Sequence, residues 1–185
     1  MNKQDARSKF RELRSGLSEA QVDGLSRKIL THLKELILEK EFIHIFLPIK
    51  KNQEINTWMI IDELKDTHTF IVSKTDFQLH SMRHFELDTN TTFAENQLGI
   101  PEPVNATPFD PQKIDTVLIP LLAYDIKGSR VGYGQGYYDQ FLAMLKPDVT
   151  KIGLSFFQPL DHIETETHDI KLDLCVTPDG TVRFS

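Results

Sequence analysis

The residues best suited to chemistry lie in one glycine-rich stretch, Gly128 to Asp139 (GSRVGYGQGYYD), which holds four of the chain's nine glycines. Glycine lets a ligand approach the backbone closely, and successive bare N–H groups form an electropositive nest for an anion. Arg130 within the stretch is suited to gripping phosphate oxygens bidentately. Asp139 stands where a Mg²⁺ ion beside a phosphate would find a carboxylate. The stretch therefore predicts a phosphate site.

Familiar phosphate motifs do not account for this spacing. No Gly-Lys-Ser/Thr closes the loop as in a P-loop, and Asp139 occupies the place of the third glycine of a dinucleotide fingerprint. A flexible turn that needs several positive-φ residues is the plainer interpretation of the glycines. A carboxylate that stabilises the helix dipole is the plainer interpretation of Asp139. On spacing alone, both alternatives stay open.

The elements on either side of the loop must position it. Residues 114–119 are β-branched or apolar and end at Pro120, which predicts a buried strand. From Tyr138 to Leu145, apolar residues recur at helical spacing. Phosphate binds well at helix N-termini because orphan N–H groups and the macrodipole favour negative charge there. The loop is therefore expected to join a buried strand to the start of a helix.

The rest of the chain alternates between helical and extended patterns, which predicts an α/β domain with a mostly parallel sheet. Residues 86–112 are polar and proline-containing, and we expect a long, partly extended excursion there. We expect a single domain over 1–185. The expected helices cover 3–15, 19–38 after a capping box at Ser18, and 57–64; the expected strands cover 42–47, 69–72, 78–85, 151–156 and 173–177, with a terminal edge at 181–184.

Composition excludes several classes of protein. The net charge of −6 argues against a general nucleic-acid binder, and no apolar run approaches the length of a membrane span. The single Cys175 lies in a predicted strand and is expected to be a structural thiol. The N-terminus lacks the apolar core of a signal peptide, so a cytoplasmic protein is expected. His80 and His84 have the spacing of a helical metal pair but lie in strand-like sequence, which favours ordinary surface histidines.

The run from Ile119 to Leu142 resembles the signature of the 5-formyltetrahydrofolate cyclo-ligase family, also called 5,10-methenyltetrahydrofolate synthetases. The resemblance covers nearly the whole chain. Its other parts follow in the expected order: the basic opening segment 3–11, Phe46-Leu47-Pro48 with Glu54-Ile55-Asn56-Thr57 after it, the segment 99–103, and the segment 168–178.

The resemblance implies a three-layer α/β/α fold similar to that of ribose-5-phosphate isomerase and the CoA transferases. It implies a monomeric ligase that uses ATP and Mg²⁺ to close 5-formyltetrahydrofolate to 5,10-methenyltetrahydrofolate. ADP and phosphate would be released, and the reaction would pass through an N5 iminium phosphate. Two alternatives stay open: a folate- or nucleotide-binding relative with reduced or no ligase activity, and a sugar-phosphate isomerase or acyl-CoA-type enzyme on a similar fold.

The resemblance also implies roles for individual residues. Arg130 and Tyr137 are the expected catalytic residues, and Asp139 and Asp173 the expected Mg²⁺ ligands. The expected ATP-binding residues are Lys3, Arg7, Arg130, Val131, Gly132, Tyr133, Gly134, Gln135, Gly136, Tyr137 and Tyr138. The expected folate-binding residues are Leu47, Ile49, Glu54, Tyr133, Gly134, Gln135, Gly136 and Tyr137.

Two features temper these assignments. Lys3, Arg7, Arg11 and Arg14 recur along one side of a short helix, which is also the pattern of a solvated basic face. Many members of the family read Gly-Arg-Gly-Lys-Gly where this chain reads Gly-Tyr-Gly-Gln-Gly over 132–136. Two loop cations are thereby replaced by neutral residues, so the loop is expected to stabilise a transferred phosphoryl group less strongly.

Overall fold

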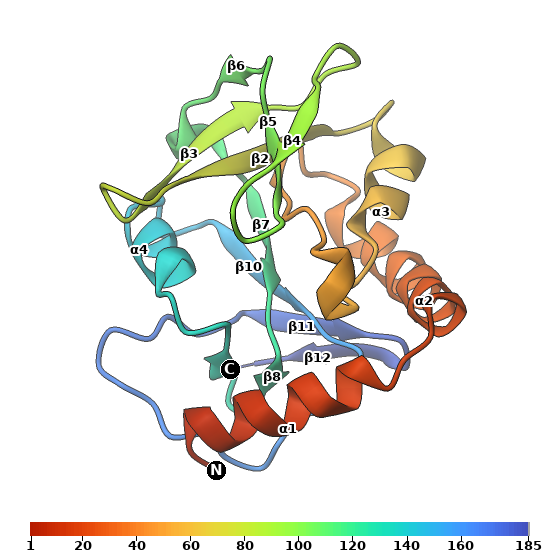
Figure 1. Cartoon of the computed structure of the whole chain (residues 1–185), viewed down its shortest axis with the longest axis vertical. Coiled ribbons are helices and arrows are strands. Elements are labelled where there is room, and N and C mark those ends of the chain that lie inside the picture. Colours follow the sequence, from red (N-terminus) through yellow and green to blue (C-terminus); the bar gives the residue numbers. More distant parts are fainter. Residues whose placement is uncertain (185) are drawn as a thin grey trace.

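The computed structural model describes residues 1–184, which form a central eight-stranded sheet with helices on both faces (Figure 1). The five central strands are parallel, and antiparallel strands close both edges. The strands, in spatial order, are β12 (Gly180–Arg183), β11 (Leu174–Thr177), β10 (Thr150–Leu154), β7 (Thr116–Pro120), β1 (Phe42–His44), β2 (Thr69–Asp76), β3 (Ser81–Glu86) and β6 (Thr107–Pro108).

Residues 1–184 form four α-helices: α1 (Lys3–Ser15), α2 (Glu19–Ile37), α3 (Thr57–Leu64) and α4 (Tyr137–Ala143). The last three pack on the sheet, whereas the buried side of α1 packs on residues 122–131. The predicted capping box at the start of α2 is present, because Ser18 and Gln21 each bond to the other's backbone N–H. None of the helices within residues 1–184 combines the length and apolarity needed to cross a bilayer.

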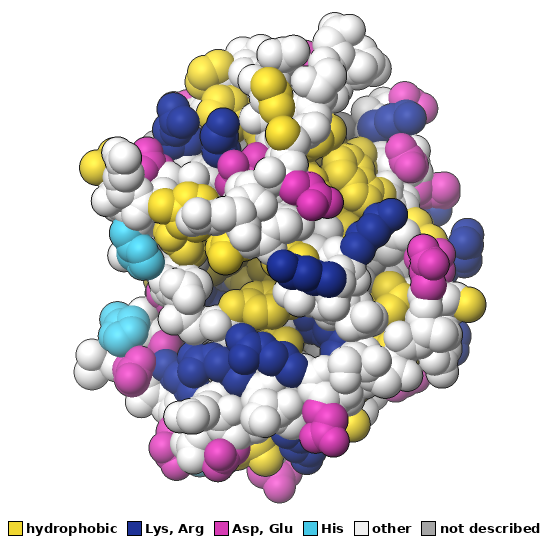
Figure 2. Space-filling view, in the orientation of Figure 1, with side chains coloured by type: hydrophobic (Ala, Val, Ile, Leu, Met, Phe, Trp, Pro, Cys, Tyr) yellow, Lys and Arg dark blue, Asp and Glu magenta, His cyan; other side chains and the backbone are white. Residues whose placement is uncertain are grey.

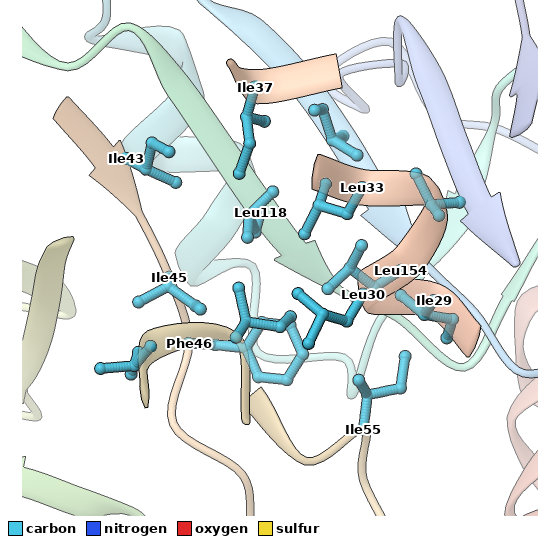
Figure 3. Packing of buried hydrophobic residues seen from close by; sticks show 14 of the residues in the cluster. Ile29, Leu30, Leu33, Ile37, Ile43, Ile45, Phe46, Ile55, Leu118 and Leu154 are labelled. Atoms are coloured by element: carbon cyan, nitrogen blue, oxygen red, sulfur yellow. The ribbon is translucent and has the colours of Figure 1, made fainter. Parts of the chain in front are cut away.

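The core lies on both faces of the sheet because the central strands are apolar on both sides. Along β7, Leu118 packs into the cluster beneath α2 and α3, whereas Val117 and Ile119 face the cluster that contains Phe141 of α4. Figure 3 shows the first cluster, in which α2 side chains meet those of the central strands. The predicted layered α/β architecture with a mainly parallel sheet is confirmed.

The excursion over 86–112 has more structure than the sequence indicated. It forms a hairpin of β4 (Phe93–Glu95) and β5 (Pro101–Pro103), and then β6 at the sheet edge. The buried Glu102 ties the hairpin to β2, because its carboxylate accepts bonds from Thr75 N–H at 2.7 Å and from the Asn96 amide at 2.8 Å.

Two short elements stand beside the carboxyl ends of the central strands. One is the 3₁₀ helix η1 (Lys50–Asn52) after β1, and the other is the hairpin of β8 (Ala123–Tyr124) and β9 (Arg130–Val131) after β7. A second 3₁₀ helix, η2 (Pro111–Lys113), precedes β7. β1 lies between β2 and β7, so the chain winds outward in opposite directions from this point. In open α/β sheets, such a reversal leaves a crevice at the carboxyl ends of the strands, where ligands bind.

Candidate active site

A cleft of about 380 Å³ lies at this reversal point, at the carboxyl ends of β1, β2 and β7. Most of the surface that the wall presents to the cleft is apolar or aromatic, although many of the lining residues also carry a polar group, and such a wall suits an organic ligand. Figure 2 shows a hollow with hydrophobic side chains, bordered by Lys and Arg side chains over α1 and by others on its opposite side. The polar side chains of the wall are Arg11, His44, Lys51, Asn52, Glu54, Ser73, Thr75, Tyr133, Gln135, Tyr137 and Tyr138.

A smaller, polar basin of about 120 Å³ adjoins the cleft, and Pro120 and Tyr138 line both. Its wall consists of the glycine loop after β9, the first two turns of α1 and the segment 166–169. The charged residues of this wall are Lys3, Arg7, Arg130, Asp139, Glu166 and Asp169. The basin is therefore a charged compartment next to an apolar one.

The glycine loop folds tightly under Arg7. Gly134 and Gly136 have positive φ angles of 97° and 71°, which favour glycine. The Nε atom of Arg7 donates to the Gly132 carbonyl at 3.1 Å, and a Cβ atom at Gly134 would lie 3.3 Å from the Arg7 Cζ atom. The loop glycines thus let the guanidinium of α1 rest on the loop. Arg7 and the loop, both expected to bind ATP, therefore lie in contact.

Lys3 stands at the basin between two carboxylates. Its Nζ atom is 2.9 Å from Glu166 and 2.7 Å from Asp169. Partial burial alone would raise the pKa of Asp169, but bonds from the Glu166 N–H and from Lys3 outweigh it and lower that pKa. Glu166, His168 and Asp169 offer ligand atoms that all lie within 4.8 Å of one another. These oxygens already hold one cation, the Lys3 ammonium.

Arg130 is a buried guanidinium bound to protein partners. Its Nη2 atom is 2.8 Å from the Asp139 carboxylate, and its Nη1 atom donates to the Ile170 carbonyl. Asp139 also accepts a bond from the Ile170 N–H at 3.1 Å. Arg130 and Asp139 both line the basin, and together they fix the segment after Asp169 to the start of α4. This pair holds the wall of the basin in place.

Glu54 is the buried carboxylate of the cleft. Its Oε2 atom accepts from the Ile49 N–H at 2.7 Å, and its Oε1 atom accepts from the Tyr133 hydroxyl. Arg14 donates to the same hydroxyl at 2.6 Å and to the Leu121 carbonyl at 2.6 Å. Burial raises the pKa of Glu54, and the bonds from Ile49 and Tyr133, with the nearby Arg14, partly offset this rise. The carboxylate is therefore held in one orientation.

The remaining predicted residues are distributed between the two cavities. Leu47, Ile49, Gln135 and Tyr137 line the cleft; Gly132, Gly134 and Gly136 line the basin. Val131 lines the basin but is buried in the cluster beneath α1. The Tyr137 ring stacks on His80 at 4.5 Å between centroids, and burial raises the pKa of Tyr138.

Asp173 does not join Asp139. It lies at the amino end of β11, where it accepts from the Lys151 N–H at 2.7 Å and pairs with the Lys151 ammonium at 2.9 Å. Because β7, β10 and β11 are parallel, Asp173 lies at the amino ends of these strands, whereas Pro120 lies at their carboxyl ends. The structure instead brings Asp169 to the basin, because the segment before β11 passes along the glycine loop.

Sequence reasoning missed three other features. In the sequence, Arg14 is only one member of a basic row. Its spacing of four residues from Phe10, which faces the core, places it on the buried side of α1. His84, expected at the surface, is only 6% exposed, because β3 turns it toward Phe141 of α4. His44 and Ser73, which line the cleft, belong to no sequence motif that would have indicated a role for them.

The chain matches the model of the "5-formyltetrahydrofolate cyclo-ligase family" over residues 1–178. It is 27% identical over 178 residues to the 5-formyltetrahydrofolate cyclo-ligase of Haemophilus influenzae, covering 92% of this chain and 94% of that one.

Among solved structures, it resembles the NMR structure of Aquifex aeolicus 5,10-methenyltetrahydrofolate synthetase with a TM-score of 0.85 and 27% identity. That match covers 98% of this chain and 92% of the other. The 5,10-methenyltetrahydrofolate synthetase of Mycoplasma pneumoniae is similar with a TM-score of 0.76 and 26% identity, over 96% of this chain and 99% of that one.

Proposed function

Because the chain belongs to the 5-formyltetrahydrofolate cyclo-ligase family and is an enzyme of that kind, we propose that its two adjoining cavities divide the substrates between them. The apolar cleft takes the reduced folate, and the charged basin takes the phosphates of ATP. The observation that carries the proposal is the shared wall at Pro120 and Tyr138, which brings a mainly apolar cleft into contact with a charged, polar basin.

In this arrangement the transferred phosphoryl group lies over the glycine loop. Lys3 and Arg7 face it from α1, and loop N–H groups face it from below. Arg130 acts mainly by holding Asp139 and the Ile170 carbonyl, so its contribution to catalysis is positional. Tyr137 lines the cleft and offers ring surface and a hydroxyl to the pterin.

The chemistry asks for positioning and charge neutralisation more than for a protein nucleophile. The formyl oxygen on N5 attacks the γ-phosphorus of ATP, the bond to the β-phosphate oxygen breaks, and ADP leaves. N10 of the resulting N5 iminium phosphate then attacks the formyl carbon and loses its proton. The carbon–oxygen bond breaks, phosphate leaves, and the methenyl bridge remains.

The donor set of the basin fits Mg²⁺, which takes one or two carboxylates together with phosphate oxygens. Asp139 and Asp169 are the carboxylates that would hold it, and Asp169 replaces Asp173 in this role. Lys3 is held by Glu166 and Asp169, which supports a place for positive charge there. When bound, the ion would neutralise charge on the phosphate oxygens.

The test is turnover by the purified chain with 5-formyltetrahydrofolate and Mg-ATP, followed by the ultraviolet absorbance of the methenyl product and by release of ADP and phosphate. We expect one ADP and one phosphate for each methenyl product formed. Lys3→Met is expected to raise KM for ATP about tenfold while changing KM for the folate little. A folate KM that rises as much as the ATP KM would contradict the division of the substrates.

A further inference from the structure

Two histidines and a serine form a hydrogen-bonded row at the floor of the cleft. Ser73 on β2 lies between them, with its Oγ atom 2.7 Å from His44 Nε2 and 3.1 Å from His84 Nδ1. His44 is 0% exposed and His84 6% exposed, whereas Ser73 is only half-buried. His44 and Ser73 both line the cleft. The serine is therefore the member of the row that a bound ligand can reach.

The outer ring nitrogens of this row, His44 Nδ1 and His84 Nε2, are buried without a hydrogen-bond partner in the described part of the chain. Both rings pack against aromatic side chains, His84 on Phe141 at 4.2 Å and His44 on Phe141 at 4.8 Å. Burial lowers the pKa of His84 to about 4 and lowers that of His44 well below its ordinary value. Each imidazole is thus neutral near pH 7 and carries one proton.

The positions of the protons follow from these contacts. If Ser73 donates to either histidine, that histidine carries its proton on the outer nitrogen, and a buried N–H group is left without an acceptor. If both histidines donate to Ser73, the outer nitrogens are both lone pairs. Buried N–H groups without a partner are rarer than unfilled acceptors, so the second arrangement is favoured. In that arrangement, both lone pairs of Ser73 are filled and its own proton is free.

We propose that Ser73, with His44 and His84 both donating to it, is a specificity residue that donates a hydrogen bond to the 4-oxo group of the pterin ring. This inference rests on the proposed placement of the folate in the cleft. A carbonyl oxygen at that position accepts the free serine proton. An amino group at the same position would place its N–H against the serine O–H, so two donors would face each other. To accept from the amino group, Ser73 would have to donate to one histidine, and the outer N–H of that ring would then be buried without an acceptor.

The experiment compares folic acid with its 4-amino analogue, which carries an amino group in place of the 4-oxo group and lacks the proton on the adjacent N3. Turnover of 5-formyltetrahydrofolate is measured first, because an inactive wild-type chain would overturn the proposed function itself. Dissociation constants for the two ligands are then measured with wild type, Ser73→Ala and Thr75→Ala. Thr75 is the matched control, since it carries a hydroxyl into the same cleft from the same strand without a histidine row.

We expect Ser73→Ala to weaken folic acid about tenfold while leaving the 4-amino analogue nearly unchanged, because only the former loses a hydrogen bond. Thr75→Ala is expected to change both ligands by the same factor. A ratio of the two affinities that stays the same in Ser73→Ala would overturn the proposal.

A second measurement does not depend on a variant. Nitrogen NMR of the histidine rings in the folic acid complex is expected to show protons on His44 Nε2 and His84 Nδ1, the nitrogens that face Ser73. An unprotonated nitrogen at either position in the complex would overturn the proposal, because Ser73 would then be donating to that ring.

Discussion

Arg14 of α1 and Tyr133 of the glycine loop are joined by a hydrogen bond of 2.6 Å between the guanidinium and the phenol oxygen. Arg11 of the same helix lies over the Tyr133 ring, 6.0 Å from its centroid. Tyr133 stands where the family resemblance has a loop cation in many relatives. In this chain, the guanidinium groups of Arg11 and Arg14 on α1 lie beside that position instead. The Tyr133 hydroxyl in turn donates a hydrogen bond to the Glu54 carboxylate.

Removing the hydroxyl of Tyr133 tests this connection. Tyr133→Phe leaves Arg14 and one oxygen of Glu54 without their shared partner, so we expect a loss of about 1–3 kcal/mol in unfolding free energy. We also expect KM for 5-formyltetrahydrofolate to rise about tenfold. Chemical denaturation and steady-state kinetics measure the two effects. Tyr124→Phe is the control, since Tyr124 is fully buried and lines neither cavity, and it is expected to leave KM unchanged.

Of the two aspartates before β11, only Asp169 is expected to contribute to the Mg²⁺ site, whereas Asp173 is not. Asp169→Asn is expected to lower kcat by about a hundredfold and to raise the Mg²⁺ concentration needed for half-maximal rate, because it removes a carboxylate of the basin. Asp173→Asn is expected to retain near-normal kcat, because Asp173 pairs with Lys151 at the opposite edge of the sheet. Magnesium titrations of the rate distinguish the two variants. The reverse pattern would return Asp173 to the metal site.

Restoring a loop cation is expected to help ATP binding. Gln135 lines the cleft beside the glycine loop, and its backbone carbonyl accepts a hydrogen bond from His80 Nε2 at 2.8 Å. Because that contact uses the backbone, Gln135→Lys keeps it while adding a positive side chain. We expect KM for ATP to fall several-fold, with a steeper dependence on salt than in wild type. A large loss of kcat in this variant would show that the loop works with a neutral residue only.

Acid is expected to destabilise the fold through the buried histidines. Because the pKa of His84 is lowered from 6.5 to about 4, the unfolded chain binds a proton in this range that the native chain does not. Stability is therefore fully present above about pH 6.5 and is lost as pH falls toward about 4, by about 2–3 kcal/mol for this group. Urea denaturation across the range measures the loss.

The matched variant for the acid effect is His84→Gln, which cannot titrate in this range. It is expected to be less stable near neutral pH, because Ser73 loses its ring partner. Its unfolding free energy should nevertheless fall less steeply between about pH 6.5 and 4 than that of wild type. Parallel slopes in the two proteins would assign the acid sensitivity to other groups, such as the carboxylates paired with Lys3.

Periodicity was enough to predict most of the elements, because α2, β7 and the start of α4 bury faces whose spacing is visible in the chain. The capping box at Ser18 predicted the start of α2 for the same local reason. The hairpin over 93–103 was not predicted, since its prolines resemble a loop and its attachment depends on Glu102 meeting β2.

The residues of the candidate site likewise differ in how far local sequence patterns could predict them. The glycine loop, Lys3 and Arg7 could be predicted because they form a local pattern or a motif of the family. Asp169 could not be separated from Asp173, since both precede one strand and only the path of the chain decides which reaches Asp139. The row of His44, Ser73 and His84 comes from three different strands, so no local spacing could indicate it.

Arg7 and Arg14 are seven residues apart on α1, which is two helical turns and about 10 Å along its axis. Arg7 contacts the glycine loop, which we propose faces the nucleotide, and Arg14 contacts Tyr133, the partner of Glu54 in the cleft that we propose for the folate. In the proposed arrangement, the distance between the two substrates therefore depends on the helical rise between Arg7 and Arg14. A single residue inserted between them would swing one guanidinium about 100° away, so this stretch should tolerate substitutions far better than changes in length.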